Sequence, residues 1–88
     1  MKKIELDITN IHTAKALHVY LAYRLDLPAY YGGNLDALYD ALGEIASPVT
    51  LTLCGAPASG EMAAYLPRLT QVMEDAAQEN PNLKLERV

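Results

Sequence analysis

The chain has 88 residues, 51% hydrophobic and 20% charged, a composition that predicts one globular domain over residues 1–88 and excludes extensive disorder. Its net charge of −4 at pH 7 disfavours binding to nucleic acid and favours a basic protein partner. No apolar run reaches the roughly 18 residues that cross a bilayer, and Glu5 and Asp7 interrupt any signal-peptide core. With Cys54 as the single cysteine, we expect a cytoplasmic protein that does not contact membranes and has no internal disulfide.

Three segments alternate apolar and polar residues with the period of a strand. Their apolar positions are Ile4, Leu6 and Ile8; Val49, Leu51 and Leu53; and Leu83 and Leu85. The polar or small residues between them predict a sheet with one buried face and one face at least partly in water. Residues 9–48 and 55–82 are too long for hairpins and carry helical patterns, so they fit crossovers between parallel strands. We expect an α/β fold with a three-stranded parallel sheet, three or four helices and two layers.

Cap residues indicate where the helices begin. The first helix is predicted to start after Thr13 and to end before Pro28, and the second to start after Asn34 and to end between Gly43 and Pro48. The third is predicted to start near Leu66, with Pro67 in its first turn, and to run towards residues 80–81. Residues 55–64 fit either a loop or a short helix nucleated at Pro57.

One face of the second helix is acidic. A helical wheel places Asp36, Tyr39, Asp40 and Gly43 together on its outward side. Asp36 and Asp40 are a like-charge i, i+4 pair that costs about 0.2–0.5 kcal/mol, so helix stability alone does not account for them. The ordinary alternatives are a favourable carboxylate in the first turn for Asp36 and a solvated surface residue for Asp40.

The segment before this helix reads Pro-Ala-Tyr-Tyr-Gly-Gly-Asn over residues 28–34. Its two glycines permit a tight turn, and two adjacent tyrosines must point in different directions, so we expect one to pack and one to face a partner. The glycines lack the lysine and the serine or threonine of a phosphate-binding loop.

These residues carry a resemblance to a known family. The stretch LDLPAYYGGNLDALYDAL, residues 25–42, closely resembles the signature of the barstar family, small intracellular inhibitors of bacterial secreted ribonucleases. Weaker similarity covers the ALH of residues 16–18, the strand after Pro48, and QVMEDA followed by a final strand. The family's three-stranded parallel sheet with helices agrees with the pattern described above.

The resemblance implies roles for individual residues. Asp40 matches the aspartate that enters the phosphate pocket of the ribonuclease, Asp36 one that pairs with a basic residue at its rim, and Tyr30 the aromatic that packs on the catalytic histidine. Further contact positions match Gly32, Asn34, Leu35 and Asp75, where Asp75 replaces a longer glutamate. Tyr39 stands where the best-known member has tryptophan, Gly33 replaces a charged residue, and Ile45 is nearest to a second tryptophan.

We therefore expect a non-enzymatic inhibitor of a basic bacterial ribonuclease, secreted or of the toxin type, which imitates RNA phosphate. It would be a monomer when free and would use no cofactor or metal. One alternative is an acidic binding module or immunity protein of the same fold, directed at another basic partner. Another is a carboxylate enzyme built on Asp36, Asp40, Glu44 and Asp75. We expect His18 to be a partly buried packing residue and the Cys54 thiol to be structural.

Overall fold

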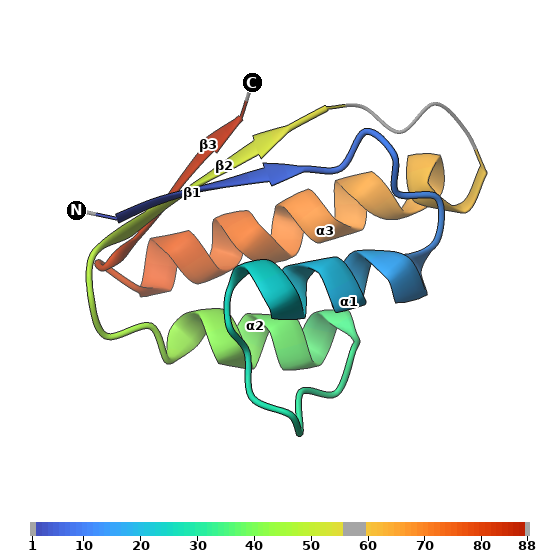
Figure 1. Cartoon of the computed structure of the whole chain (residues 1–88). Coiled ribbons are helices and arrows are strands. Elements are labelled where there is room, and N and C mark those ends of the chain that lie inside the picture. The colour runs from blue at the N-terminus through green and yellow to red at the C-terminus, as the bar shows by residue number, and fades with distance from the viewer. Residues whose placement is uncertain (1, 56–59, 88) are drawn as a thin grey trace.

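The computed structural model describes residues 2–55 and 60–87. In this part of the chain, strands β1 (Lys2–Asp7), β2 (Val49–Cys54) and β3 (Leu83–Arg87) form a parallel sheet in the order β1-β2-β3. Helices α1 (Ala14–Arg24) and α2 (Leu35–Gly43) connect β1 to β2, and α3 (Gly60–Glu79) precedes β3 (Figure 1). The predicted α/β architecture with three parallel strands is confirmed.

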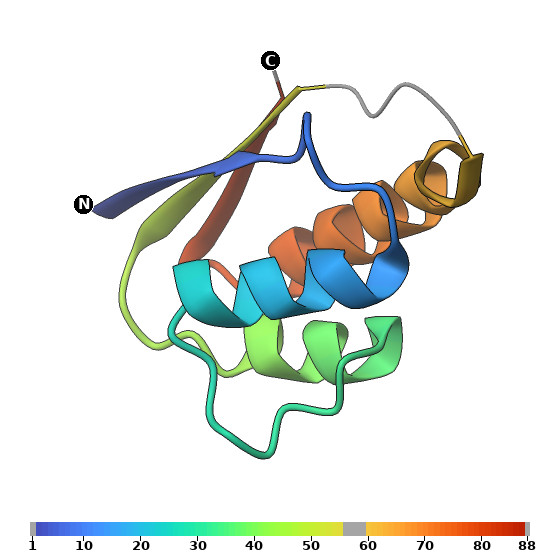
Figure 2. The same cartoon turned by 45° about the vertical axis from the view of Figure 1, so that its right-hand side comes forward.

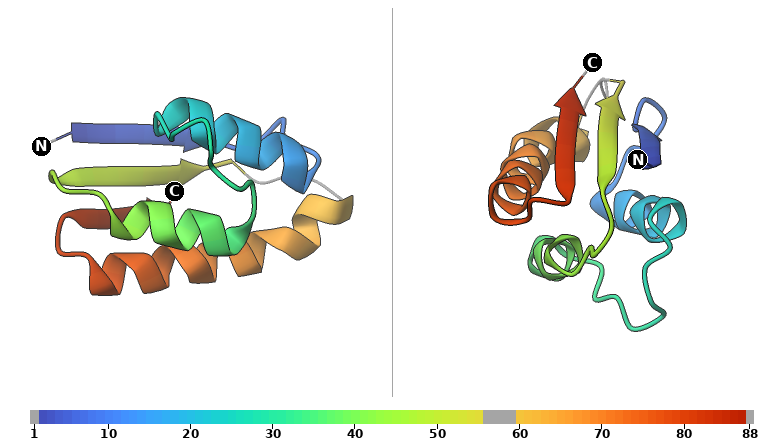
Figure 3. Two further views of the ribbon diagram at one scale, coloured as in Figure 1. Left: turned by 90° about the horizontal axis from the view of Figure 1, so that it is seen from below. Right: turned by 90° about the vertical axis from the view of Figure 1, so that its left-hand side faces the viewer.

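The helices lie on one side of the sheet, as Figures 1 and 2 show. Because the strand order advances in one direction, two right-handed crossovers place their helices on the same face. In the right-hand view of Figure 3, α1 lies below β1, α3 lies beside β3, and α2 is farthest from the strands. The predicted two layers are therefore confirmed. The largest fully buried side chains between them are Leu6, Ile8, Leu17, Leu21, Leu38, Leu42, Leu51, Met62, Leu69 and Met73.

The opposite face of the sheet is wet mainly along its edges. Lys3 on β1 and Glu86 on β3 form an ion pair of 3.2 Å that spans the central strand. Beneath it Thr50 and Thr52 are each only 6% exposed, and the Thr52 hydroxyl donates to the Glu86 carboxylate at 3.2 Å. The central strand is thus buried on both faces.

Both predicted helix starts with a polar cap are confirmed. The Thr13 hydroxyl accepts a hydrogen bond from the Ala16 amide at 3.1 Å at the start of α1. The Asn34 side chain accepts from the Ala37 amide at 2.8 Å at the start of α2. Each cap satisfies one of the amides that the first helical turn leaves without a partner.

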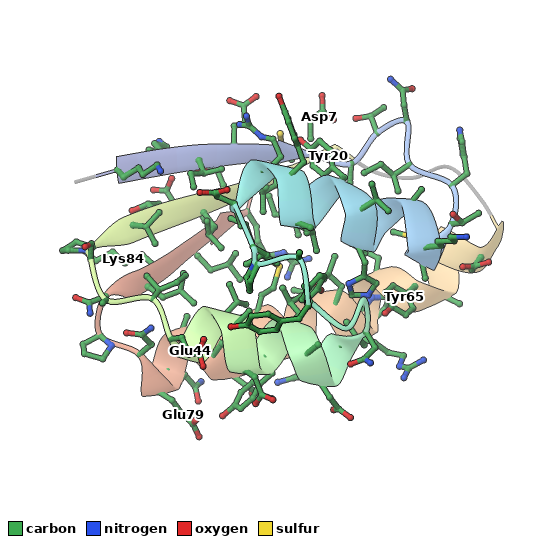
Figure 4. All side chains as sticks on the ribbon, turned by 60° about the horizontal axis from the view of Figure 1, so that its bottom comes forward. Asp7, Tyr20, Glu44, Tyr65, Glu79 and Lys84 are labelled. Atoms are coloured by element: carbon green, nitrogen blue, oxygen red, sulfur yellow. The ribbon has the colours of Figure 1, made fainter. Side chains whose placement is uncertain are left out.

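Side chains from α1 also cover the outer edge of β1. The Tyr20 hydroxyl accepts from the Asp7 amide at 2.9 Å, and Figure 4 shows these two residues next to each other. The Arg24 guanidinium donates to the Glu5 carbonyl at 2.8 and 3.2 Å. Such contacts occupy backbone groups that would otherwise be open to pairing with another chain.

The predicted start of the third helix near Leu66 is wrong, because α3 already begins at Gly60 and Pro67 lies inside it. Fully buried Met62 and Leu69 anchor the helix on either side of the proline. The carbonyl that loses its partner belongs to Ala63, an exposed residue, so water can satisfy it. Residues 60–64 are thus helical, whereas 56–59, including Pro57, lie outside the described residues. No helix in the described ranges combines the length and apolar character needed to cross a membrane.

Candidate partner-binding face

The acidic side of α2 points into solvent. Leu38 and Leu42 are fully buried, whereas Asp36, Asp40 and Gly43 on the other side are exposed. The 3.6-residue period separates these two sets, since a helix that buries one stripe must present the opposite one. The predicted exposure of both aspartates is confirmed.

The acidic side of α2 has no lysine or arginine on its own helix and no ion-pair partner among the described residues. The sequence contains no lysine or arginine between Arg24 and Arg68, a stretch that includes the whole of α2. Within the described ranges the ion pairs are Lys3 with Glu86 and Arg87 with Glu74, neither of which involves α2. The carboxylates of Asp36 and Asp40 are therefore available to hydrogen-bond donors of another molecule.

The helical wheel places Tyr39 on the outward side of α2, and the structure shows that this is wrong. It is half-buried, packs against the core, and donates its hydroxyl to the Glu79 carboxylate on α3. That hydrogen bond is the largest cause of the raised pKa of Tyr39, ahead of burial. The charges of Asp75 and Asp40 raise the same pKa further, so both carboxylates lie on the side of the molecule where α2 meets α3.

Asp75 therefore belongs to the same acidic surface as Asp40. It is exposed and accepts a hydrogen bond from the Gln71 side chain one turn earlier at 2.9 Å. Glu79 also belongs to this surface, although it is not among the residues predicted from the sequence. The available signal was its spacing, since Glu79 follows Asp75 by one helical turn.

A groove of about 770 Å³ runs between the ends of α2 and α3. Tyr39, Asp40, Glu44 and Glu79 contribute to its walls. Figure 4 shows Glu44 and Glu79 at the same end of the two helices. The lining contains no lysine or arginine, so the groove extends the region of negative potential beyond Asp40.

The loop before α2 separates its two tyrosines as predicted. Tyr30 is 85% exposed, whereas Tyr31 is half-buried and hydrogen-bonded to His18 at 2.6 Å. The loop lies at the end of the molecule away from the sheet (Figures 1 and 2). Tyr30 is thus a projecting aromatic group on the same side of the sheet as α2.

The other predicted contact positions differ in what they can offer a partner. Gly32 is exposed, and a Cβ atom there would lie 3.2 Å from Ala37 Cβ, so a side chain would crowd the start of α2. The side-chain oxygen of Asn34 caps the helix, which leaves the side-chain nitrogen of the same residue for an outside contact. Leu35 is half-buried against the core and presents only part of its side chain.

His18 is a buried packing residue, as predicted. It is 4% exposed, with one ring nitrogen hydrogen-bonded to Tyr31 and the other to Tyr65 on α3 at 2.8 Å. Cys54 donates its thiol to the Leu6 carbonyl at 3.6 Å, and burial raises its pKa, which agrees with a structural thiol. Within residues 2–55 and 60–87, His, Cys, Asp and Glu side chains form no group of three suited to a metal ion.

Fold and surface together define a class: a small α/β binding module whose acidic helix and projecting tyrosine lie on the side away from the sheet. The sequence model of the family described as "Barstar (barnase inhibitor)" matches residues 1–86. A Bacillus subtilis (strain 168) protein named "Putative ribonuclease inhibitor YrdF" is 37% identical over 81 residues, which cover 90% of this chain and 89% of that protein. The chain belongs to the barstar family. The family description is that of an inhibitor, in agreement with the expected non-enzymatic role.

Proposed function

We propose that this protein inhibits a basic bacterial ribonuclease, secreted or of the toxin type, by covering its active site. The observation that carries the proposal is the exposed pair Asp36 and Asp40 on a helix that contains no lysine or arginine and takes part in neither ion pair of the described residues. Membership of the barstar family and the exposed Tyr30 support it.

The chemistry follows from what a ribonuclease must bind. Its active site holds a phosphodiester, and therefore presents basic donors in a concave pocket of positive potential. Carboxylates of Asp36 and Asp40 can accept charge-assisted hydrogen bonds from such donors. They offer the enzyme no phosphorus–oxygen bond to break, so occupancy of the pocket amounts to inhibition.

The surrounding residues would shape the contact. Tyr30 offers a rigid ring with a polar tip, which binds a flat surface at small entropic cost. Asp75 on α3 supplies a further carboxylate, while Gly32, Asn34, Leu35 and Tyr39 would contribute backbone, amide and packing contacts around it. Complementary charge would mainly accelerate the encounter and set its register.

A matched pair of charge-removing variants tests the proposal. Asp40→Asn should weaken the complex by at least about 2 kcal/mol, roughly 30-fold in Kd, the general threshold for an interface hot spot, whose examples include the barnase–barstar pair. Tyr30→Ala and Asp36→Asn should follow in rank. Glu5→Gln removes the same charge from an exposed position on β1 and should leave Kd within about twofold.

The measurement is isothermal titration calorimetry against a panel of microbial ribonucleases, with inhibition of RNA cleavage as a second readout. Equal effects of Asp40→Asn and Glu5→Gln would refute the role of Asp40. Failure of the wild-type protein to bind any ribonuclease at low salt would refute the proposed class of target and favour a different basic partner.

A further inference from the structure

The proposed function leaves one buried polar group without a role. His18 on α1 places Nδ1 2.6 Å from the Tyr31 hydroxyl and Nε2 2.8 Å from the Tyr65 hydroxyl. Tyr31 comes from the loop before α2 and Tyr65 from α3, which Figure 4 labels where α3 passes α1. A single imidazole ring therefore joins three segments that are distant in the sequence.

Apart from the packing of Tyr31 against the core, the loop before α2 has few contacts with the rest of the protein. In residues 28–34, a segment that the structure describes completely, Tyr31 is partly buried and its neighbours are exposed. The other hydrogen bonds made by this segment are local, from the Tyr31 amide to the Pro28 carbonyl and through the Asn34 cap. The bond between Tyr31 and His18 is thus the long-range hydrogen bond of the loop, one residue away from Tyr30.

We propose that His18 is a positioning residue for the partner-binding loop: its neutral ring holds Tyr31 so that Tyr30 projects, and protonation of the ring releases the loop and weakens binding. The role presupposes the proposed function, because it concerns the same binding surface.

Protonation changes the hydrogen-bonding roles of the ring. A neutral imidazole donates from one nitrogen and accepts at the other, so one tyrosine hydroxyl accepts from the ring and the other donates to it. A protonated ring donates from both nitrogens, and the hydroxyl that donated must turn its proton away. Burial raises the pKa of Tyr31 to about 12, so this phenol stays protonated throughout and cannot offset the charge.

Charged side chains from α1 and α3 lie near this cluster. Lys15 on α1 lines the same groove of about 480 Å³ as His18, Tyr31 and Tyr65. On α3, Arg68 lies 5.6 Å from the centre of the Tyr65 ring. Glu61 acts on Tyr65 with the opposite sign, but its carboxylate already accepts from the Ala14 amide at 2.6 Å.

The direction of the pH effect follows from linkage. Burial lowers the pKa of His18 below 6.5 in the folded protein, whereas a released ring would titrate near 6.5. The released form therefore binds the proton more readily, and acid favours it. Because one proton is involved, Kd should rise by at most about tenfold per pH unit as pH falls from 6.5 to the lowered pKa of His18, and should level off below it. The loss should appear mainly in the association rate, since a smaller fraction of molecules is ready to bind.

The free protein provides the first test, and it requires no ribonuclease. NMR titration between about pH 4.5 and 7.5 should show the amides of Tyr30 and Gly32 shifting together with the ring signals of His18. Tyr31→Phe should abolish this coupling, whereas Tyr65→Phe, which removes the other hydrogen bond of the same ring, should preserve it. The proposal would be overturned if the chemical shifts of the loop amides did not follow the His18 titration, or if the two phenylalanine variants behaved alike.

Binding kinetics to an inhibited ribonuclease provide the second test. Tyr31→Phe should lower the association rate about threefold or more at pH 7.5 with the dissociation rate unchanged, and Tyr65→Phe should change either rate by less than about twofold. A higher dissociation rate for Tyr31→Phe would indicate a direct contact instead and would overturn the proposal. His18→Gln, whose amide can both donate and accept, should bind at pH 7.5 but lose the additional acid dependence. Absence of any ribonuclease binding would refute the proposed function, while the NMR titration would still decide the role of His18 in the loop.

Discussion

Replacement of Asn80 should show how α2 is held in place. This residue lies just after α3 and is only 7% exposed. The side-chain nitrogen of Asn80 donates to the Leu42 and Ile45 carbonyls at 2.9 and 3.1 Å. The side-chain oxygen of Asn80 accepts from the backbone amide of Asn82 at 3.0 Å. Asn80 thus satisfies carbonyls that the C-terminal end of α2 leaves open.

Asn80→Ala removes these three hydrogen bonds, each worth about 1 kcal/mol net, so the expected loss in unfolding free energy is about 3 kcal/mol. A domain of this length has about 4–13 kcal/mol in total. With a urea m value near 1 kcal/mol/M, the unfolding midpoint should fall by about 3 M. Asn82→Ala removes only a 3.4 Å contact to the Ile45 carbonyl and should cost less than about 1 kcal/mol.

A charge variant gives the same interaction a pH signature. Asn80→Asp puts a carboxylate against the two carbonyl oxygens, so it should destabilise the fold more than Asn80→Ala near pH 7. The two carbonyl oxygens favour the protonated carboxyl, which can donate a hydrogen bond to them, and so raise its pKa in the folded state. This variant should therefore regain stability as pH falls towards 4. Urea unfolding followed by circular dichroism at pH 7 and pH 4 measures both effects. A loss below about 1 kcal/mol for Asn80→Ala, or no recovery of Asn80→Asp in acid, would refute the capping role.

Two further predictions concern the loop after β2 and the end of β1. Gly55 has φ +89°, and an added Cβ would lie 2.9 Å from the Thr9 amide nitrogen, so Gly55→Ala should cost at least about 2 kcal/mol in urea unfolding. Gly33 has φ +70° but open space around it, so Gly33→Ala should cost only about 1 kcal/mol, and equal costs would show that the clash is relieved. The Thr9 amide and hydroxyl donate to the Asp7 carboxylate at 3.0 and 2.7 Å and lower its pKa below 3.8. The stability from this contact is therefore present above pH 3.8 and lost as pH falls through the lowered value; Asp7→Asn should flatten this part of an acid-unfolding profile, and an unchanged profile would contradict the assignment.

Features that depend on nearby residues were predictable from the sequence. The strands follow from alternation over a few positions, and the starts of α1 and α2 follow from Thr13 and Asn34, whose side chains bond amides only three residues away. The exposure of Asp36 and Asp40 also follows locally, because the period of one helix decides which side is buried.

The predicted start of α3 is wrong because the prediction places Pro67 in the first turn of the helix. Met62, Leu69 and Met73 continue one apolar stripe through the proline, and that spacing would have favoured the longer helix. A proline inside a helix is acceptable only where the carbonyl it leaves open is solvated, and solvation depends on the packing of α3.

Contacts between distant segments were not predictable in the same way. Tyr39 and Glu79 are 40 positions apart, and their hydrogen bond depends on how α2 is packed on α3. The two partners of His18 come from a loop and another helix, so the sequence could indicate a packed histidine but not what it bonds.

The acidic surface owes its rigidity to residues outside it. A nine-residue helix is too short to be stable alone, and the Asp36–Asp40 pair makes it less so. Leu38 and Leu42 bind it to the core, Asn34 closes its start and Asn80 its end. Since none of these groups is a cation, they hold the helix without neutralising it. A lysine placed to relieve the repulsion would stabilise the helix but would occupy the carboxylates that we propose for binding a basic partner. Support by packing and neutral caps instead preserves both the fold and the charge.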